Sequence, residues 1–392
     1  MAQAEGSTIP PPRARRVRTS TRRFMVAIVL VLTLAGMVRQ SVSVGIKTLA
    51  LLPEAFENAP VRPLLVFTAP PSHREITWQS PAGRVDADLY LPAGPGPFGG
   101  IVLFTGAFGL RRAENMVRFA EGLARSGAAV LVPESEALQR GDIVPDEVDT
   151  LIQSLQALQA EPSVDAQRMG LAGFSVGGSL VLLAVEDPRG AELAQFANVL
   201  GAFFDAREML ISIASREIVV DSVAVPWTPD AVTRYTFVKH LILSMTEGLE
   251  KRTLAEAYLS VPPLGLPDGA VLSQEGRVVV GLIEGGSREQ VTELVRELHP
   301  SALEWLAAIS PSERVDQIRT KLYVMHDRGD VFVPFTEARR LVAGAAPEVL
   351  QRFTESALFA HVTIDEHLPP TQIAGELWKL YIHLWALGLE FL

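Results

Sequence analysis

Alternating polar and apolar residues mark where the folded part of the chain begins. Residues 74–80 and 84–91 alternate on either side of Pro81-Ala82-Gly83, and this pattern predicts a β-hairpin. Further along, short runs rich in apolar residues indicate strands that are covered on both faces of a sheet. The predicted strands are 101–104, 128–132, 168–172, 196–204 and 321–325.

Helical periodicity lies between these strands. Residues 111–126 and 146–160 carry apolar side chains at helical spacing. Strands that alternate with helices predict a right-handed, mostly parallel sheet with helices on both faces, so we expect an α/β fold. The last segment, 377–392, is apolar on nearly all sides. We interpret it as a final helix packed on the sheet, with a membrane-surface or dimer contact as the alternative.

The strand predicted at 168–172 leads directly into Gly173-Phe174-Ser175-Val176-Gly177-Gly178. A strand that becomes a helix within two residues strains the turn residue and leaves no room for side chains beside it. Gly173 and Gly177 meet that requirement on either side of Ser175. The pattern predicts that Ser175 is a nucleophile raised above the sheet, with the N–H of Val176 as an oxyanion donor. An ordinary glycine-rich turn is the alternative.

A loop of small residues follows the predicted strand 101–104. This loop, Thr105-Gly106-Ala107-Phe108-Gly109, stands at the carboxyl end of the strand, where ligands bind in open α/β sheets. Small side chains let the backbone approach a ligand closely. We therefore predict that the N–H of Ala107 is a second oxyanion donor, with Phe108 packed nearby. A plain glycine turn is again the alternative.

The order of these features resembles the α/β-hydrolase superfamily, and most of all its branch of dienelactone hydrolases and related esterases and peptidases. The hairpin, the loop at 105–109, Arg168-Met169-Gly170 and the Gly-Phe-Ser-Val-Gly-Gly segment carry the resemblance. Where this chain has Thr105-Gly106, the branch often has His-Gly. The resemblance implies an α/β-hydrolase core at 74–206 and 310–392.

The resemblance also implies a catalytic acid after a later strand and a histidine nearer the C-terminus. The segment after strand 321–325 is similar to the family's Gly-x-x-Asp-x-x-Val-Pro, which places the acid at Asp330, with Asp327 as the alternative. The histidine is implied at His361, with His367 as the alternative. The acid would accept the Nδ1–H of the histidine and stabilise the imidazolium that forms during attack. We interpret His383 as a packed core residue.

An insertion at 207–309 separates the two parts of the core, where this superfamily places a lid over the nucleophile. Its periodicity predicts mainly helices, at 207–215, 229–244, 247–259 and 288–297, with a short apolar run at 278–283. The lid hypothesis gives four residues a place in an apolar wall above Ser175, and the alternative is that they pack the insertion's own core. These residues are Met209, Leu210, Trp227 and Phe237.

The N-terminal region combines a basic cluster with an uncharged apolar run. Residues 1–23 are rich in arginine, and residues 24–38 contain no charge. We expect 1–23 to be a cytoplasmic tail and 24–40 an uncleaved membrane anchor, which places the body outside the cytoplasm. A cleaved export signal and a helix of the domain are the alternatives. Residues 41–73, rich in proline, are interpreted as a linker.

Composition narrows the chemistry further. The chain has no cysteine, which excludes disulfides, thiolate metal sites and a cysteine nucleophile. The chain beyond the N-terminal region is acidic, which disfavours nucleic acid as a partner. No His-Glu-x-x-His or comparable spacing occurs, so neither a metal nor another cofactor is expected.

These features together predict a serine hydrolase that cleaves a carboxylic ester or thioester through an acyl-enzyme. One alternative is a peptidase or acyltransferase that uses the same residues. The other is a non-catalytic, membrane-anchored binding protein that keeps the fold.

Overall fold

The computed structural model describes residues 36–56, 59, 61–360, 363–364 and 369–392. The chain forms two compact units, Met1–Ile46 and Lys47–Leu392. Residues 36–46 of the first unit are helical. The fold and the site described below belong to the second unit.

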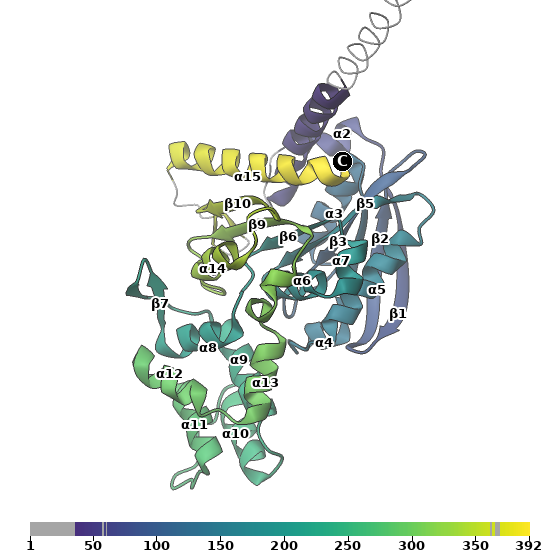
Figure 1. Ribbon diagram of the computed structural model, residues 1–392. Helices are drawn as coiled ribbons and strands as arrows, with labels where there is room; N and C mark the ends of the chain where they lie inside the picture. The colour runs from purple at the N-terminus through teal and green to yellow at the C-terminus, as the bar shows by residue number, and fades with distance from the viewer. Residues whose placement is uncertain (1–35, 57–58, 60, 361–362, 365–368) are drawn as a thin grey trace, which may run out of the picture. The chain divides into compact units, whose positions relative to one another are not determined.

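A mixed sheet forms the centre of the second unit (Figure 1). Its strand order is β1-β2-β4-β3-β5-β6-β9-β10. The pairs β1–β2 and β2–β4 are antiparallel, and from β4 to β10 every neighbouring pair is parallel. The bounds are β1 Ser72–Ser80, β2 Gly83–Leu91, β3 Phe98–Phe104, β4 Ala129–Ser135, β5 Val164–Phe174, β6 Phe196–Leu200, β9 Lys321–Asp327 and β10 Leu350–Ser356.

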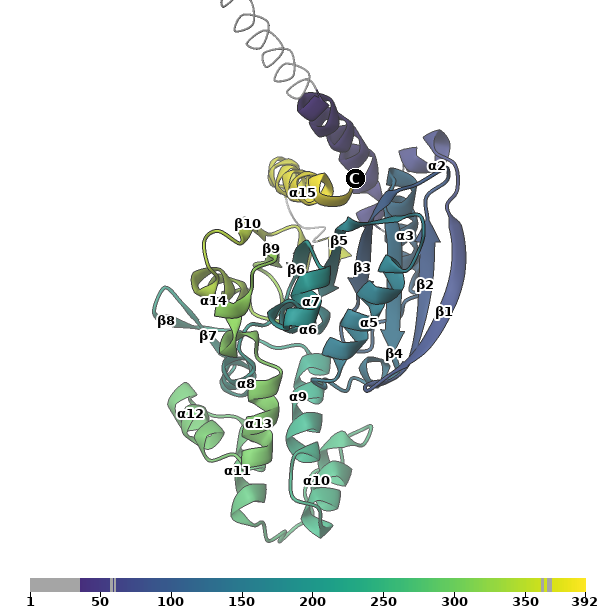
Figure 2. The same cartoon turned by 45° about the vertical axis from the view of Figure 1, so that its right-hand side comes forward.

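Helices cover both faces of this sheet (Figures 1 and 2). One face packs against α3, Glu114–Ser126, and the C-terminal helix α15, Pro370–Phe391. The other face packs against α5, Glu147–Gln159, α6, Val176–Glu186, and α14, Thr336–Gly344. The predicted α/β fold, with a mostly parallel sheet between two helical layers, is confirmed.

The insertion between β6 and β9 gathers at one end of the sheet (Figures 1 and 2). It also contains a two-stranded ribbon that the sequence did not predict, because its strands are only four residues long. The apolar run at 278–283 lies inside a helix, α11. The bounds are α8 Ala206–Ser215, β7 Glu217–Val220, β8 Val223–Pro226, α9 Ala231–Leu243, α10 Leu249–Leu259, α11 Gln274–Glu284, α12 Arg288–Arg296 and α13 Pro300–Ala308.

Two further segments differ from expectation. The strand predicted at 196–204 ends at Leu200, because Gly201 has a positive φ of 64° and turns the chain away from the sheet. Part of the segment interpreted as a linker is helical, with the short helices η1, Leu52–Ala55, and α2, Pro63–Phe67. Proline begins α2 and stands near the start of η1, positions that it tolerates.

The predicted membrane anchor falls almost wholly outside the described residues, as does the basic tail at 1–23. Among the helices of the described residues, none combines the length and apolar character that a membrane span needs.

Candidate active site

Ser175 stands at the abrupt turn from β5 into α6. Its backbone angles, φ 55° and ψ −131°, are rare for a residue with a side chain. The Ser175 N–H donates to the carbonyl of Leu200 at the end of β6, and Gly178 N–H donates to the Ser175 carbonyl. These two bonds fix the strained turn on the sheet and on the first turn of the helix, so the predicted strand–turn–helix geometry is present.

The flanking glycines are required by contact as well as by conformation. A Cβ on Gly173 would lie 2.4 Å from the carbonyl oxygen of Gly177, and one on Gly177 would lie 2.2 Å from that of Thr105. Both distances are far inside van der Waals contact. Any side chain at either position would push α6 off the sheet and displace Ser175.

The loop after β3 faces the same turn. A Cβ on Gly106 would lie 3.0 Å from Ser175 Cβ and 3.5 Å from its Oγ, so this glycine borders the hydroxyl directly. Gly109 N–H donates to Gly106 O and closes a tight turn in which Phe108 has a positive φ of 59°. The Phe108 N–H donates to Leu138 O, whereas the Ala107 N–H donates to none of the described residues. Ala107 and Val176 both line the cavity at Ser175.

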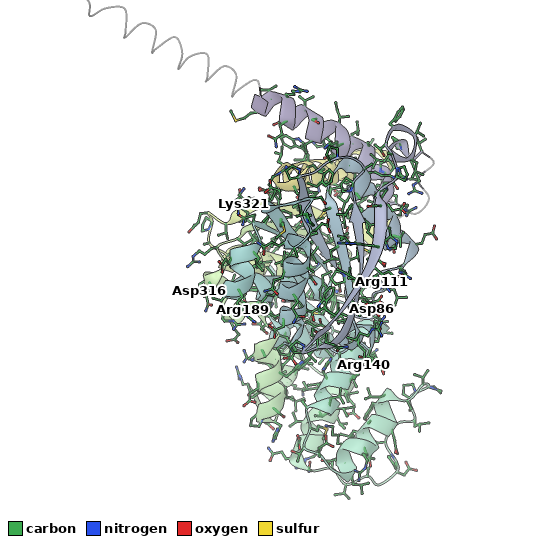
Figure 3. All side chains as sticks on the ribbon, turned by 90° about the vertical axis from the view of Figure 1, so that its right-hand side faces the viewer. Asp86, Arg111, Arg140, Arg189, Asp316 and Lys321 are labelled. Carbon is green, nitrogen blue, oxygen red and sulfur yellow. The ribbon has the colours of Figure 1, made fainter. Side chains whose placement is uncertain are left out.

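An ion-pair cluster around the buried Asp88 anchors the end of this loop. Asp88 on β2 is fully buried and accepts hydrogen bonds from Arg111 at 2.5 Å and from Arg112 at 3.0 and 3.1 Å. His73 Nε2 lies 2.8 Å from the same carboxylate. Burial alone would raise the pKa of Asp88, but the hydrogen bonds from Arg112, His73 and Arg111 outweigh it and lower the pKa to about 2. Arg111, labelled in Figure 3, therefore ties the loop to the sheet.

The predicted acid lies in the loop that follows β9. Asp330 is 4% exposed, and its Oδ1 accepts hydrogen bonds from the N–H groups of Phe332 at 2.7 Å and Val333 at 3.0 Å. A Cβ on Gly201, at the end of β6, would lie 3.2 Å from Asp330 Oδ2. Because the neighbouring Leu200 accepts the N–H of Ser175, the acid and the serine flank the same strand end. The alternative acid, Asp327, caps the turn through Gly329 N–H at 2.8 Å.

The insertion holds the acid loop through three successive backbone carbonyls. Trp227 Nε1 donates to Asp330 O at 3.0 Å, Asp230 N–H donates to Val331 O at 2.8 Å, and Thr233 Oγ1 donates to Phe332 O at 3.1 Å. Trp227 and Asp230 lie in the segment between β8 and α9, and Thr233 lies in the first turn of α9. The position of Asp330, the predicted acid, therefore depends on an element far from it in the sequence, which the sequence pattern did not indicate.

The predicted base, His361, and its alternative, His367, lie outside the described residues. The strands β11, Phe359–Ala360, and β12, Thr363–Ile364, flank position 361 in the sequence.

Three other histidines have structural roles. His326 is fully buried, donates from Nε2 to Val333 O at 2.9 Å and lies 3.5 Å from Asp330 Oδ2. His240 stacks on Trp305 at 4.6 Å and accepts the Ile143 N–H, and burial lowers its pKa to about 4.

His383 on α15 confirms the expectation of a packed core residue. It is 1% exposed, and burial lowers its pKa to about 3. Its Nε2 donates to Asn198 Oδ1 at 2.8 Å, and its Nδ1 accepts from Thr354 Oγ1 at 3.0 Å. The ring is thus neutral, with both nitrogens satisfied.

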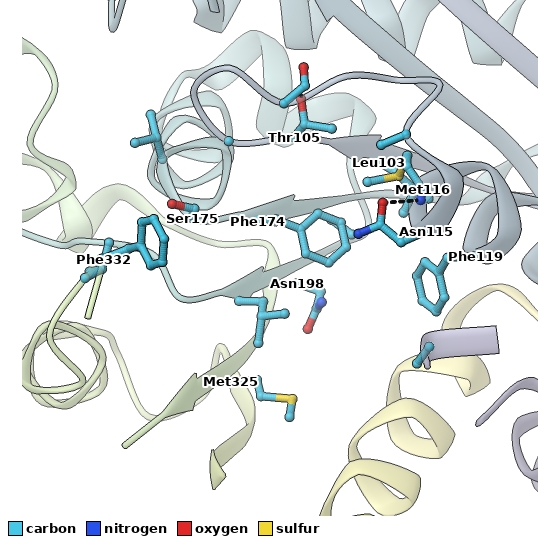
Figure 4. A pocket seen from close by; sticks show the side chains of 18 of the residues that line it. Leu103, Thr105, Asn115, Met116, Phe119, Phe174, Ser175, Asn198, Met325 and Phe332 are labelled. Carbon is cyan, nitrogen blue, oxygen red and sulfur yellow. Dashed lines mark hydrogen bonds between the residues drawn. The ribbon is translucent and has the colours of Figure 1, made fainter. Parts of the chain in front are cut away.

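A cavity of about 380 Å³ opens at Ser175 (Figure 4). Helix α9 of the insertion borders it through Thr233, Thr236 and Phe237. In the opposite direction it passes between the sheet and helices α3 and α15. In Figure 4 the ring of Phe174 lies between Ser175 and the side chains of α3.

The four residues proposed as a lid wall differ in whether they face the cavity at Ser175 or only pack in the core. All four are buried in one core cluster. Met209 and Phe237 also line the cavity, whereas Leu210 packs within the core. Trp227 acts on the acid loop, as described above.

Comparisons with known proteins give one distant relative in sequence and several in structure. No family model matches the chain. It is 32% identical over 122 residues to the mouse mitochondrial acyl-coenzyme A thioesterase 2. The aligned region covers 30% of this chain and only 25% of that protein.

Two solved structures illustrate the structural likeness. The 2,6-dihydroxy-pseudo-oxynicotine hydrolase is 14% identical with a TM-score of 0.45, and the alignment covers 80% of this chain and 68% of that one. The acylaminoacyl peptidase of Pyrococcus horikoshii is 11% identical with a TM-score of 0.45, covering 83% and 42%. These overlaps are too distant to transfer an activity.

Proposed function

We propose that this protein is a serine hydrolase that cleaves a carboxylic ester or thioester through an acyl-enzyme. The observation that carries the proposal is the strained turn at Ser175, which presents a hydroxyl to a largely apolar cavity at the start of a helix. The distant sequence similarity to a thioesterase supports the choice of an acyl substrate.

In the proposed reaction the Ser175 oxygen attacks the substrate carbonyl while His361 accepts the hydroxyl proton. The N–H groups of Val176 and Ala107 stabilise the oxyanion, and each such donor contributes about 3 kcal/mol in the transition state. The carbon–oxygen or carbon–sulfur bond then breaks, and His361 gives its proton to the leaving group. Water then attacks the acyl-enzyme carbonyl while His361 accepts its proton. Ser175 is regenerated and the carboxylic acid product is released. Asp330 orients His361 throughout.

Labelling by a fluorophosphonate probe tests the nucleophile. We expect the wild-type protein to be labelled and to hydrolyse ester and thioester substrates, and Ser175→Ala to do neither. His361→Ala should label far more slowly, because the serine loses its general base. Wild-type protein that is folded but neither labelled nor active would contradict the proposal and favour a binding protein. Release of acyl product to an added alcohol or amine in preference to water would favour an acyltransferase.

The membrane anchor at residues 24–40 remains part of the proposal, supported by the basic cluster beside an uncharged run. Full-length protein should stay with membranes after carbonate washing, and protease added outside the cytoplasm should reach the body of the protein. Recovery of the full-length chain in the soluble fraction would contradict an anchor.

A further inference from the structure

The cavity at Ser175 extends well beyond the space that a reacting carbonyl needs. Along β3 its lining runs from Thr105 back to Ile101, about 13 Å at the rise of a strand. Along α15 it runs from Leu380 to Leu392, about 18 Å at the rise of a helix. Its volume of about 380 Å³ lies in the range of pockets that hold a whole small ligand.

The part of the cavity between the sheet, α3 and α15 is almost entirely apolar. Leu103 and Met325 rise from the sheet, Met116 and Phe119 come from α3, and Leu384 and Leu387 come from α15. Figure 4 shows Leu103, Met116, Phe119 and Met325 around this space. Such a surface favours methylene groups and offers no partner to a charged one.

Most of the polar side chains in this part of the cavity have partners. Asn198 accepts from His383, and Asn115 Oδ1 accepts from the N–H of Met116. Glu54, on η1, is ion-paired with Arg62 at 2.7 Å through Oε2, and its buried Oε1 accepts no hydrogen bond from the described residues. It is the sole acidic side chain among the described residues that line the cavity. Apart from this one oxygen at the η1 end, the space offers a ligand mainly apolar contacts.

Helix α15 is fixed to the sheet beside this space. The ring of Phe391 stacks on Phe196 at 5.4 Å, and Glu390 accepts from Lys321 and from Tyr323. Further along the helix, His383 is bonded to β6 and β10 through Asn198 and Thr354. The cavity thus lies beneath a helix that is anchored at its end and at its middle.

From this architecture, and resting on the proposed function, we infer that the space between the sheet, α3 and α15 binds the unbranched hydrocarbon chain of a medium- or long-chain acyl substrate. The acyl carbonyl lies at Ser175, and the alcohol or thiol leaving group lies on the insertion side, beside α9. A polar leaving group could not enter the apolar end without losing its hydration. Each methylene that leaves water for this end should strengthen transition-state binding about fourfold.

A series of acyl thioesters and p-nitrophenyl esters, from acetyl through butyryl and octanoyl to dodecanoyl and palmitoyl, tests the inference. We expect wild-type kcat/KM to rise with chain length over at least part of the series. Leu384→Trp and Met116→Trp fill the cavity from opposite walls, and each should lower the dodecanoyl-to-butyryl ratio of kcat/KM roughly tenfold. Ile382→Trp adds the same bulk to α15 at a residue that does not line the cavity, and it should leave the ratio unchanged.

The failure of this inference is distinguishable from the failure of the proposed function. Active wild-type protein with no chain-length preference, or filling variants with the wild-type ratio, would overturn the acyl site and leave the hydrolase intact. If no substrate is cleaved, displacement of a fluorescent fatty acid by dodecanoate decides the matter. Displacement in Ser175→Ala that is lost in Ser175→Ala/Leu384→Trp would support the acyl site, and no binding in either would overturn it.

Discussion

At the scale of single residues, Ser175 and Gly106 leave little room for any change in backbone or side chain. The serine occupies a backbone region that ordinary residues avoid, and Gly106 faces it across a contact with no room to spare. Strain of this kind persists where the surrounding structure enforces it, and it clusters at functional sites. Small changes here should therefore affect activity more than stability.

Gly106→Ala should lower kcat/KM roughly tenfold with little change in Tm. The new methyl group would lie 3.0 Å from Ser175 Cβ, so the hydroxyl must shift by a few tenths of an ångström, and misplacement of a nucleophile slows the reaction. Ester hydrolysis and thermal melts check this. Gly248→Ala, where an added Cβ meets no described atom within 4 Å, is the matched control. Wild-type activity in Gly106→Ala would contradict the close approach.

Asp330→Asn should lower kcat by about three to four orders of magnitude, because a neutral amide cannot stabilise the imidazolium. The amide oxygen can still accept the N–H groups of Phe332 and Val333, so the loop should keep its shape. Asp327→Asn is measured beside it, since its carboxylate caps the turn at Gly329. A severe loss in Asp327→Asn with a mild one in Asp330→Asn would reassign the acid to Asp327.

At the scale of elements, the insertion supports the loop that carries Asp330 and also forms one wall of the cavity. Trp227, Asp230 and Thr233 together satisfy the carbonyls of residues 330–332. The other side of the insertion is fixed elsewhere, since Trp305 Nε1 donates to Ile143 O at 2.9 Å. Deleting the insertion would therefore disturb Asp330 as well as the cavity at Ser175.

Trp227→Phe should lower kcat several-fold, because losing one hydrogen bond of about 1 kcal/mol frees the carbonyl of Asp330 to move. Trp305→Phe removes a comparable indole hydrogen bond that does not touch the acid loop. It should destabilise the protein to a similar extent while kcat stays near wild type. Steady-state kinetics and denaturant unfolding of the two variants check this, and an equal loss of kcat in both would contradict the specific coupling.

At the scale of the whole molecule, buried ionisable groups make stability depend on pH. Glu186 ends α6, the helix that begins beside Ser175, and it is 3% exposed. Neither of its oxygens accepts a hydrogen bond from the described residues, and Arg314 Nε lies 3.8 Å away. Burial raises the pKa of Glu186 to about 8, against a smaller lowering by Arg314.

Because the folded-state pKa of Glu186 is raised, the protonated form stabilises the fold below the ordinary carboxyl pKa. That contribution is lost as the pH rises through about 8. Glu186→Gln should therefore reduce the fall in Tm between pH 5 and pH 9. At the alkaline end it should raise the free energy of unfolding by a few kcal/mol relative to wild type. Glu192→Gln, which removes an exposed carboxyl on α7, Pro188–Leu193, is the control. Identical pH slopes for wild type and Glu186→Gln would refute this role.

The sequence by itself determined the features that depend on neighbouring residues. Apolar runs and helical spacing predicted the α/β sheet, and the glycines around Ser175 predicted the strained turn. Both are local consequences of side-chain periodicity and backbone sterics. The loop at 105–109 was found in the same way, although its anchorage through Arg111 and Asp88 was not.

Only the tertiary structure decided how distant segments meet. The three donors from residues 227–233 to the acid loop, and the apolar space between α3 and α15, join parts of the chain far apart in sequence. No local pattern encodes such contacts, because a hydrogen bond or a cavity wall depends on where the folded backbone brings each group. The same apolar periodicity that predicts a helix packed on the sheet is compatible with a filled core or with an open one. Whether a cavity remains between the helix and the sheet depends on how the side chains pack in three dimensions.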